Sequence, residues 1–422
     1  MVSPYLGRVD RQGWIALGLS FLILFASLGI RMSFGAYVTA WELSFGASRS
    51  QVSLVSSVSL IVYGLGMPVV GRLVDRYGAR LVFTCSAALM GLGLAAASFA
   101  RSMEHLLWLY SVVASLGFCG ASSVTASVAL INWFPRNRAL AVGASSCGIA
   151  AGGMFLAPLT IYLIHQLGWR QTLLLLGLTC LFLLTAVMWV FFHDAPAEHF
   201  SASGAVPQSS VEPPAPAWPL VLALALAVPY FVCGFTDLGL FSTHFVPLAE
   251  GRGISAQVVA LAISINYAAN LGGNLLTGHL ADRMSLTTLL SIMYLWRALG
   301  LSFLITAVDP TSILIFAALN GAVEASTIAP TAALCAQLYG PRKVGTAYGL
   351  LSAAHQFGAA AGAFVIGALY VRSHSYHSGL ILSVALLVIA GVLTQLARRG
   401  SGALAKGFPL EPSDRDGKIK KP

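Results

Sequence analysis

The chain has 422 residues, of which 57% are hydrophobic and only 9% are charged, and its mean hydropathy is +0.80. Soluble domains carry about 25% charged residues, so this composition excludes a soluble protein and indicates a polytopic helical membrane protein. The net charge of +9 does not indicate nucleic-acid binding, because the basic residues lie in short loops and in the tail, where they set topology.

Twelve apolar segments are long enough to cross a membrane as helices. Their expected bounds are 14–39, 51–70, 81–100, 105–131, 139–165, 170–192, 218–247, 254–277, 286–307, 311–338, 343–371 and 377–397. Residues 193–217 are rich in Pro, Ser and Ala and contain no apolar run, which predicts a flexible linker. We expect an N-terminal six-helix bundle (1–192), this linker, a C-terminal six-helix bundle (218–397) and a basic tail (398–422).

The basic residues predict the orientation of the chain. If both termini lie inside, 17 Lys and Arg residues face the inner side and five face the outer side. Positive residues favour the cytoplasm, so we expect both termini and the linker to be cytoplasmic, in a plasma membrane or a bacterial inner membrane.

Two segments 207 positions apart are near copies of each other. Residues 71–80 read Gly-Arg-Leu-Val-Asp-Arg-Tyr-Gly-Ala-Arg, and residues 278–283 read Gly-His-Leu-Ala-Asp-Arg. Gln51-Val52 and Pro135-Arg136 recur 206 positions later. A repeat of this length indicates two homologous halves, which is how alternating-access transporters are built.

This repeated loop motif and the 6+6 layout resemble the major facilitator superfamily. Finer features resemble its monocarboxylate-porter branch: Arg31-x-Ser33-Phe34-Gly35, Asn132-Trp133-Phe134-x-Arg136-x-Arg138-Ala139-Leu140-Ala141-x-Gly143, Gly168-Trp169-Arg170 and His355-Gln356-x-Gly358. The resemblance covers the whole chain. It implies two pseudo-symmetric bundles and a small organic anion, such as a carboxylate, as substrate.

The resemblance also implies a gate at the loop motif. Asp75 would face the start of the eleventh span and Asp282 the start of the fifth, where a negative charge is favourable. The glycines would permit a tight turn between spans, and the arginines would stay in the headgroup layer. The alternative is a basic turn that only sets topology. The expected gating residues are Gly71, Asp75, Arg76, Gly78, Arg80, Asp282 and Arg283.

Four charged residues fall well inside predicted spans, away from their ends: Arg31, Asp237, Arg297 and Glu324. A charge at mid-membrane costs about 2.5–3.5 kcal/mol on insertion scales, so each one calls for a reason. Arg31 and Asp237 are 206 positions apart, at equivalent places in the repeat. We expect Arg31 to bind a substrate carboxylate and Asp237 to take a proton, whereas the alternative is a static salt bridge.

Arg297 and Glu324 lie near the midplane of adjacent spans and are expected to form a charge pair, either structural or involved in proton coupling. Free histidine titrates near physiological pH, so His355 is a second candidate for proton coupling, and the alternative is a hydrogen bond between helices.

Asn266, Asn270 and Asn274 are spaced by four residues and share one helical face, beside Tyr267. We expect this asparagine stripe to face the substrate, together with Tyr37, although contacts between helices are the alternative. Monocarboxylate porters often carry an Asp and an Arg where this chain has Asn270 and Asn274, so Arg31 would recognise the anion instead.

These features predict a secondary transporter of a small organic anion, coupled to protons and acting as a monomer. One alternative is a proton-driven exporter of amphipathic or cationic compounds, and another is a membrane receptor without net flux. The six cysteines show no metal-ligand spacing, and there is no nucleotide-binding loop or nucleophile–base set. We therefore expect no metal, no cofactor, no nucleic-acid partner and no enzyme activity.

Overall fold

The structure is a computed structural model that describes residues 11–196, 219–340 and 342–407. These residues form helices joined by short turns, with no strand among them. Residues 197–217 of the predicted linker and 408–422 of the predicted tail lie outside the described residues, so the division of the chain into domains stays a prediction.

Twelve helices within this part of the chain are long and apolar enough to cross a membrane, which confirms the predicted spans. The first six are built from α1 (Arg11–Met32), η1 (Ser33–Tyr37) and α2 (Val38–Phe45); α3 (Arg49–Tyr77); α4 (Ala79–Ala97); α5 (Met103–Trp108), η2 (Leu109–Ala114), α6 (Ser115–Gly120) and α7 (Ser123–Trp133); α8 (Arg138–Leu167); and α9 (Trp169–Leu178), η3 (Thr179–Leu184) and α10 (Thr185–Phe191).

The second six repeat this plan. They are built from α12 (Pro219–Gly234), η4 (Phe235–Ser242) and α13 (Thr243–Gly251); α14 (Ala256–Ala281); α15 (Leu286–Thr306); α16 (Pro310–Gly321), η5 (Ala325–Thr327) and α17 (Ile328–Tyr339); α18 (Val344–Ser373); and α19 (His377–Gly407).

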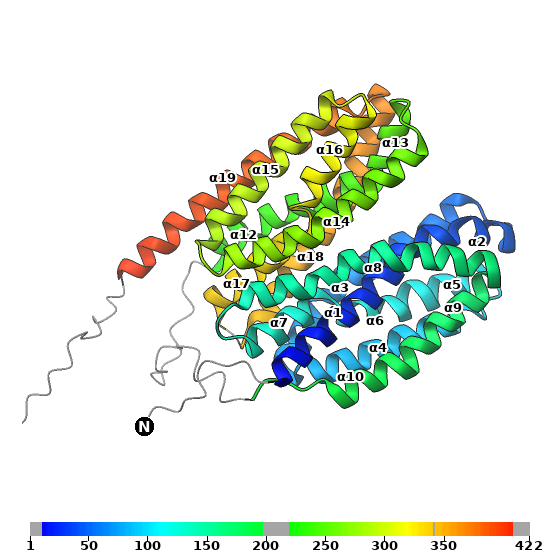
Figure 1. Cartoon of the computed structure of the whole chain (residues 1–422), viewed down its shortest axis with the longest axis horizontal. Helices are drawn as coiled ribbons and strands as arrows, with labels where there is room; N and C mark the ends of the chain where they lie inside the picture. Colours follow the sequence, from blue (N-terminus) through cyan, green and yellow to red (C-terminus); the bar gives the residue numbers. More distant parts are fainter. Residues whose placement is uncertain (1–10, 197–218, 341, 408–422) are drawn as a thin grey trace, which may run out of the picture.

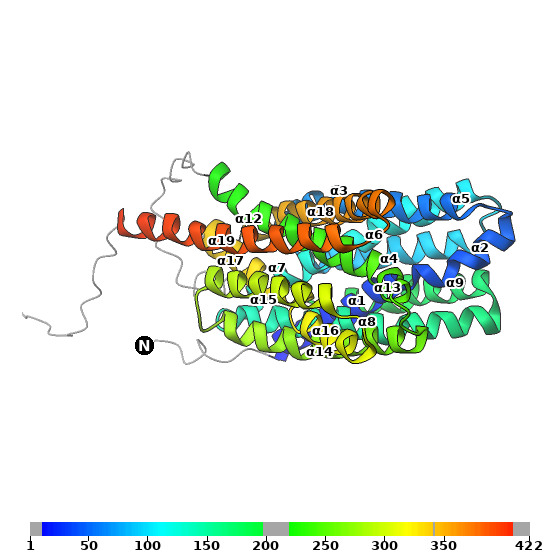
Figure 2. The ribbon, with the colours of Figure 1, turned by 90° about the horizontal axis from the view of Figure 1, so that it is seen from above.

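The helices form two bundles, α1–α10 and α12–α19, whose long axes run side by side (Figures 1 and 2). The bundles meet at the end where α1 begins and diverge toward α2 and α13 (Figure 1). We call the first the contact end and the second the divergent end.

The loop motif differs from the sequence expectation in its local structure. Helix α3 continues through Gly71 and Asp75 to Tyr77, and only Gly78, with φ +82°, turns the chain into α4. A positive φ favours glycine, so Gly78 fits the predicted tight turn. Gly71 has another role, because its missing side chain lets two helices cross closely.

Two such crossings hold the contact end together. Helix α3 crosses α18 with Gly71 against Gly345, and α14 crosses α8 with Gly278 against Ala139; a Cβ on either repeat glycine would collide with the backbone of the other bundle. The two crossings involve equivalent positions of the repeat, so the contact end follows the pseudo-two-fold symmetry of the halves. The contact extends along α3 to Gly64, where a Cβ would lie 3.1 Å from Cβ of Gln356.

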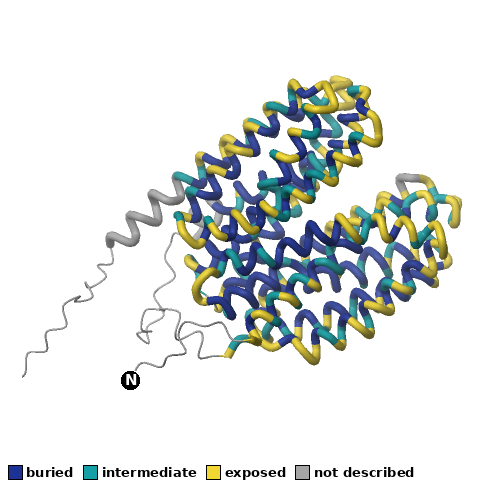
Figure 3. The backbone as a smooth tube through the Cα atoms, in the orientation of Figure 1, coloured by how far each residue is buried: buried dark blue, intermediate teal, exposed yellow. Residues whose placement is uncertain are grey.

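The outer faces of the bundles expose large apolar side chains, as expected for helices surrounded by lipid. Phe182 is 68% exposed and Leu299 is 66% exposed, whereas buried residues run through the middle of each bundle (Figure 3). The chain is an integral, multi-pass membrane protein.

Candidate functional site

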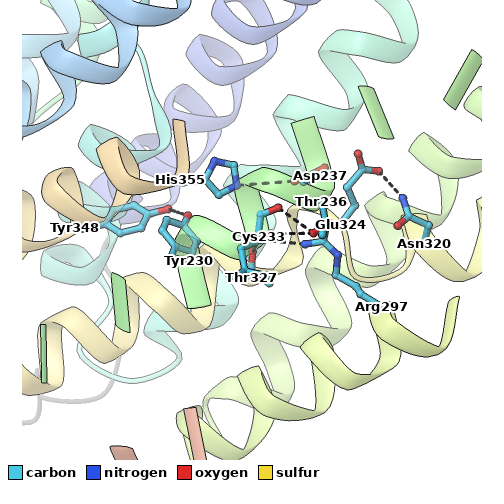
Figure 4. Close-up of polar contacts among 11 residues, drawn as sticks. Tyr230, Cys233, Thr236, Asp237, Arg297, Asn320, Glu324, Thr327, Tyr348 and His355 are labelled. Atoms are coloured by element: carbon cyan, nitrogen blue, oxygen red, sulfur yellow. Dashed lines mark hydrogen bonds and ion pairs between the residues drawn. The ribbon is translucent and has the colours of Figure 1, made fainter. Parts of the chain in front are cut away.

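A cluster of polar side chains lies inside the C-terminal bundle, around the π-helical segment η4 (Figure 4). Such segments interrupt α-helices frequently at functional sites. Asp237 lies in η4 and is 7% exposed. Glu324 lies at the break between α16 and η5, and its carboxyl group belongs to the same polar cluster as that of Asp237 (Figure 4).

Amide groups hold Glu324 in place. Asn266 on α14 donates a hydrogen bond to Oε2 of Glu324, and Asn320 donates to the same oxygen at 3.5 Å. Asn320 also donates to Oδ1 of Asn266 at 3.1 Å. In contrast, Oδ1 of Asp237 is buried with no hydrogen-bond partner among the described residues, which leaves it free to accept a proton or a ligand.

His355, on α18, lies next to this carboxyl pair. Its Nε2 is 4.0 Å from Oδ2 of Asp237, and its ring centroid lies 4.9 Å from that of Tyr230. The hydroxyl of Tyr230 in turn contacts that of Tyr348 at 3.1 Å. The structure therefore brings together the three residues predicted for proton coupling, Asp237, Glu324 and His355.

The predicted contact between Arg297 and Glu324 is not formed. Arg297, on α15, instead donates to Sγ of Cys233 and to Oγ1 of Thr236, each at 3.0 Å. Its guanidinium thus points to the seventh span, whereas Glu324 points to α14. Arg297 is 2% exposed, so its charge is balanced by the carboxyl cluster as a whole rather than by one salt bridge.

Arg31 lies at the end of α1, at the position of the N-terminal half that corresponds in the repeat to Asp237. Its guanidinium lies over the ring of Tyr63 on α3, 3.7 Å from the centroid. Among the described residues no carboxylate lies within 4.0 Å of Arg31, so the static Arg31–Asp237 salt bridge is absent here. The guanidinium is therefore held against an aromatic ring rather than by a carboxylate.

The asparagine stripe is buried and bonded to protein. Asn270 donates to the carbonyl oxygen of Gly321 at 3.1 Å, and Asn274 donates to Oδ1 of Asn270 at 2.9 Å. All three asparagines are at most 3% exposed, and they fit the alternative of contacts between helices.

Tyr37 is also placed away from the candidate site. It is fully buried in the aromatic core of its own bundle, with its ring centroid 5.4 Å from that of Trp41. The 3-10 segment η1 turns this residue into the bundle, which the helical pattern of the sequence did not indicate.

Tyr267 lies between the bundles. Its hydroxyl contacts Sδ of Met32 on α1 at 3.7 Å, and its ring approaches Gly153 of α8. Tyr267, which directly follows Asn266 of the asparagine stripe, therefore contacts the N-terminal bundle.

The two motif aspartates lie where the resemblance implies. Asp75 accepts hydrogen bonds from the backbone N–H groups of Gly345 (2.8 Å) and Thr346 (2.7 Å), at the start of α18, and from the Thr346 hydroxyl. Asp282 accepts from the N–H groups of Ala139 and Leu140, both at 2.9 Å, at the start of α8. Each carboxylate thus joins the bundles through unpaired donors of a helix N-terminus.

Asp282 lies beyond the end of its span, at the surface of the contact end. Although its side chain is partly exposed, desolvation of the carboxyl group against α8 raises its pKa, and the two backbone N–H bonds oppose this rise. The pKa of Asp282 therefore depends on whether its carboxylate is in contact with the N-terminus of α8.

The arginines of the motif contact residues of their own bundle or lie at the surface. Arg80 donates to the carbonyl oxygen of Trp189 at 2.6 and 3.1 Å, and Asp194 accepts from the N–H group of Ala79 at 2.7 Å. Arg76 lies over the ring of Tyr77, at 5.2 Å, and Arg283 is exposed. Sequence analysis missed Asp194, because it follows the sixth span more than 100 positions after the motif.

One group of side chains has the composition of a metal site. The ligand atoms of Cys233, Asp237 and His355 lie within 4.8 Å of one another. However, the Arg297 guanidinium, 3.0 Å from the Cys233 sulfur, places a positive charge at this point, which disfavours a bound cation. These residues therefore fit a proton site better than a metal site.

We expect Asp75→Asn to slow transport while leaving substrate affinity near normal. The change keeps the shape of the side chain but removes a charge that favours the α18 N-terminus, an effect of about 0.3–1 kcal/mol when exposed and more when buried. Flux and equilibrium binding of the same substrate measure the two effects separately. Asp309→Asn, at a helix N-terminus within one hairpin, is the matched control. A large loss of affinity with unchanged turnover would contradict a gating role.

A protein-family model described as Major Facilitator Superfamily matches residues 19–245 and 227–420 of the chain. Human monocarboxylate transporter 11 is 29% identical over 304 residues, which cover 68% of this chain and 61% of that protein. An uncharacterised MFS-type transporter of Bacillus subtilis, YcxA, is 24% identical over 87% of this chain and 90% of its own. The structure of the human organic anion transporter MFSD10 superimposes with a TM-score of 0.70, at 15% identity, over 93% of this chain and all of that chain.

Proposed function

The chain belongs to the major facilitator superfamily and is a membrane transporter related to monocarboxylate transporters rather than an enzyme, and on this premise we propose that it moves a small organic monoanion together with a proton by alternating access. Arg31 binds the anion, and the Asp237–Glu324 pair, beside His355, holds the proton.

The charge balance of the two bundles carries this proposal. The C-terminal cluster contains two carboxyl groups, Asp237 and Glu324, but one guanidinium, that of Arg297. With both acids ionised the cluster has a net charge of −1, which is costly inside a membrane and which one bound proton neutralises. Arg31, in the other bundle, carries a positive charge that a bound anion neutralises. A carboxylate and a proton moving together make the cycle electroneutral.

The distribution of basic residues favours one orientation in the membrane. The positive-inside count of 17 to five favours a cytoplasmic position for both termini and hence for the contact end. The two crossings and their aspartates then form the cytoplasmic gate, and the divergent end faces outward. The membrane would be a plasma membrane or a bacterial inner membrane, and a single chain contains both halves of the site.

The names of two matched proteins support an anionic substrate. One is a monocarboxylate transporter and the other an organic anion transporter. The carboxylate class rests on this relationship and on Arg31, since Asn270 and Asn274 are bonded to protein.

Flux into proteoliposomes tests the proposal. With labelled small monocarboxylates, an inward proton gradient should drive accumulation by the native protein. Asp237→Asn imitates the protonated acid, so it should still exchange substrate across the membrane but lose accumulation driven by the gradient. Asp309→Asn should behave as the native protein. Accumulation by Asp237→Asn in response to pH would place the proton elsewhere, efflux of cations in exchange for protons would favour the exporter, and binding without flux would favour the receptor.

A further inference from the structure

Tyr267 packs against the N-terminal bundle at Gly153 of α8 and Met32 of α1. A Cβ on Gly153 of α8 would lie 3.0 Å from Cζ of Tyr267 and 2.9 Å from Sδ of Met32. The ring therefore occupies the space that a side chain on Gly153 would take. The hydroxyl contact with Met32, at 3.7 Å, adds a weak bond across the interface.

The position of this ring relates it to both charged sites. Met32 directly follows Arg31, and Asn266, directly before Tyr267, donates to Glu324. Tyr267 thus contacts the chain neighbour of Arg31 across the interface and is itself the chain neighbour of the asparagine bonded to Glu324.

The interface beyond Tyr267 leads to the contact end. One turn further along α14, the carbonyl oxygen of Leu271 accepts a weak hydrogen bond from Sγ of Cys147 on α8, at 3.5 Å. Asn274 and Gly278 then pack against Gly143 and Ala139. A molecule that enters from the divergent end reaches Tyr267 before it reaches Cys147.

We propose that Tyr267, seated on Gly153 and Met32, is the inner seal of the transport site, and that its ring must leave Gly153 before substrate can pass toward the contact end. This inference rests on the proposed function only in assuming that substrate passes between the bundles. The absence of a side chain at Gly153 is what allows the seal to close against the α8 backbone.

Cys147 is a native reporter of the seal. The full-length protein, purified in detergent, is treated with N-ethylmaleimide, and mass spectrometry gives the alkylation rates of Cys147, which is buried, and of Cys85, which is exposed and serves as internal reference. Tyr267→Ala should raise the Cys147 rate relative to Cys85 at least about tenfold, because local opening then costs less. Tyr267→Phe keeps the ring and loses only the weak contact with sulfur, so its rate should stay within about twofold of the native rate.

Two further variants separate the seal from general loosening. Gly153→Ala should displace the ring and raise the Cys147 rate, whereas Gly272→Ala, where a Cβ meets nothing within 4 Å, should not. Tyr162→Ala removes an exposed tyrosine from α8 and should also leave the rate unchanged. Alkylation of Cys335, which is buried, reports general unfolding. If Tyr267→Ala raises the alkylation rate of Cys335, the Cys147 rate in Gly153→Ala is the test of the seal instead.

The proposal is overturned if Tyr267→Ala, or Gly153→Ala in its place, alkylates Cys147 at the native rate, or if Tyr267→Phe opens the interface as widely as Tyr267→Ala. The alkylation rates of Cys147 and Cys335 are measured without a substrate or a proton gradient. A failure of proton-coupled transport therefore leaves this result intact, and a failure of the seal leaves the flux result intact.

Discussion

Replacing Arg297 with glutamine is expected to destabilise the protein by about 3–5 kcal/mol, the usual cost of leaving a buried charge without compensation. Arg297 is 2% exposed and donates to Cys233 and Thr236, so glutamine would leave both groups with a weaker donor. Asp237 and Glu324 would also lose the cation that balances them. Thermal unfolding of the purified protein in detergent measures the effect, and Arg372→Gln, at an exposed position, should change little.

The double variant tests whether charge balance is the cause. If the cluster acts as a whole, Arg297→Gln combined with Glu324→Gln should regain much of the lost stability, although the two side chains are not in contact. Additive losses, equal to the sum of the single variants, would mean that Arg297 acts only through its bonds to Cys233 and Thr236.

Hydropathy was sufficient to predict the twelve spans, because a bilayer requires about 20 apolar residues for each helix that crosses it. The positions of Asp75 and Asp282 followed from the resemblance, since the loop motif fixes which helix start each one meets. The local structure of the motif did not follow. A glycine in a short polar stretch reads as a turn, and the crossing that explains Gly71 involves Gly345, 274 positions later.

The partners of the buried charges could not be predicted for a related reason. Arg297 and Glu324 lie on adjacent spans at a similar depth in the membrane, which suggested a charge pair. Depth does not specify the direction of a side chain around the helix axis, and the break after α16 turns Glu324 toward Asn266 on α14. Cys233 and Thr236, which bind Arg297, carry no charge that would have marked them in the sequence.

Arg31→Gln is expected to weaken binding of a small monocarboxylate by about 30-fold or more, because truncating one partner of a hydrogen-bonded charge pair costs about 2–5 kcal/mol. The guanidinium is already held over Tyr63, 3.7 Å from the ring centroid, and in the proposed site its fork of donors binds the carboxylate. Arg31→Lys keeps the charge but loses the fork, and it should give an intermediate affinity.

Equilibrium binding or stabilisation of the purified protein by substrate measures this effect without any flux. Since Arg31 makes no ion pair within 4.0 Å among the described residues, Arg31→Gln without substrate should unfold near the native temperature, as should Arg101→Gln at an exposed position. Normal affinity in Arg31→Gln would remove the anion site from the N-terminal bundle. The acids Asp237 and Glu324, which outnumber Arg297 in the C-terminal cluster, would then be the groups available to substrate, and a cationic substrate, as in the exporter alternative, would fit them better than an anion.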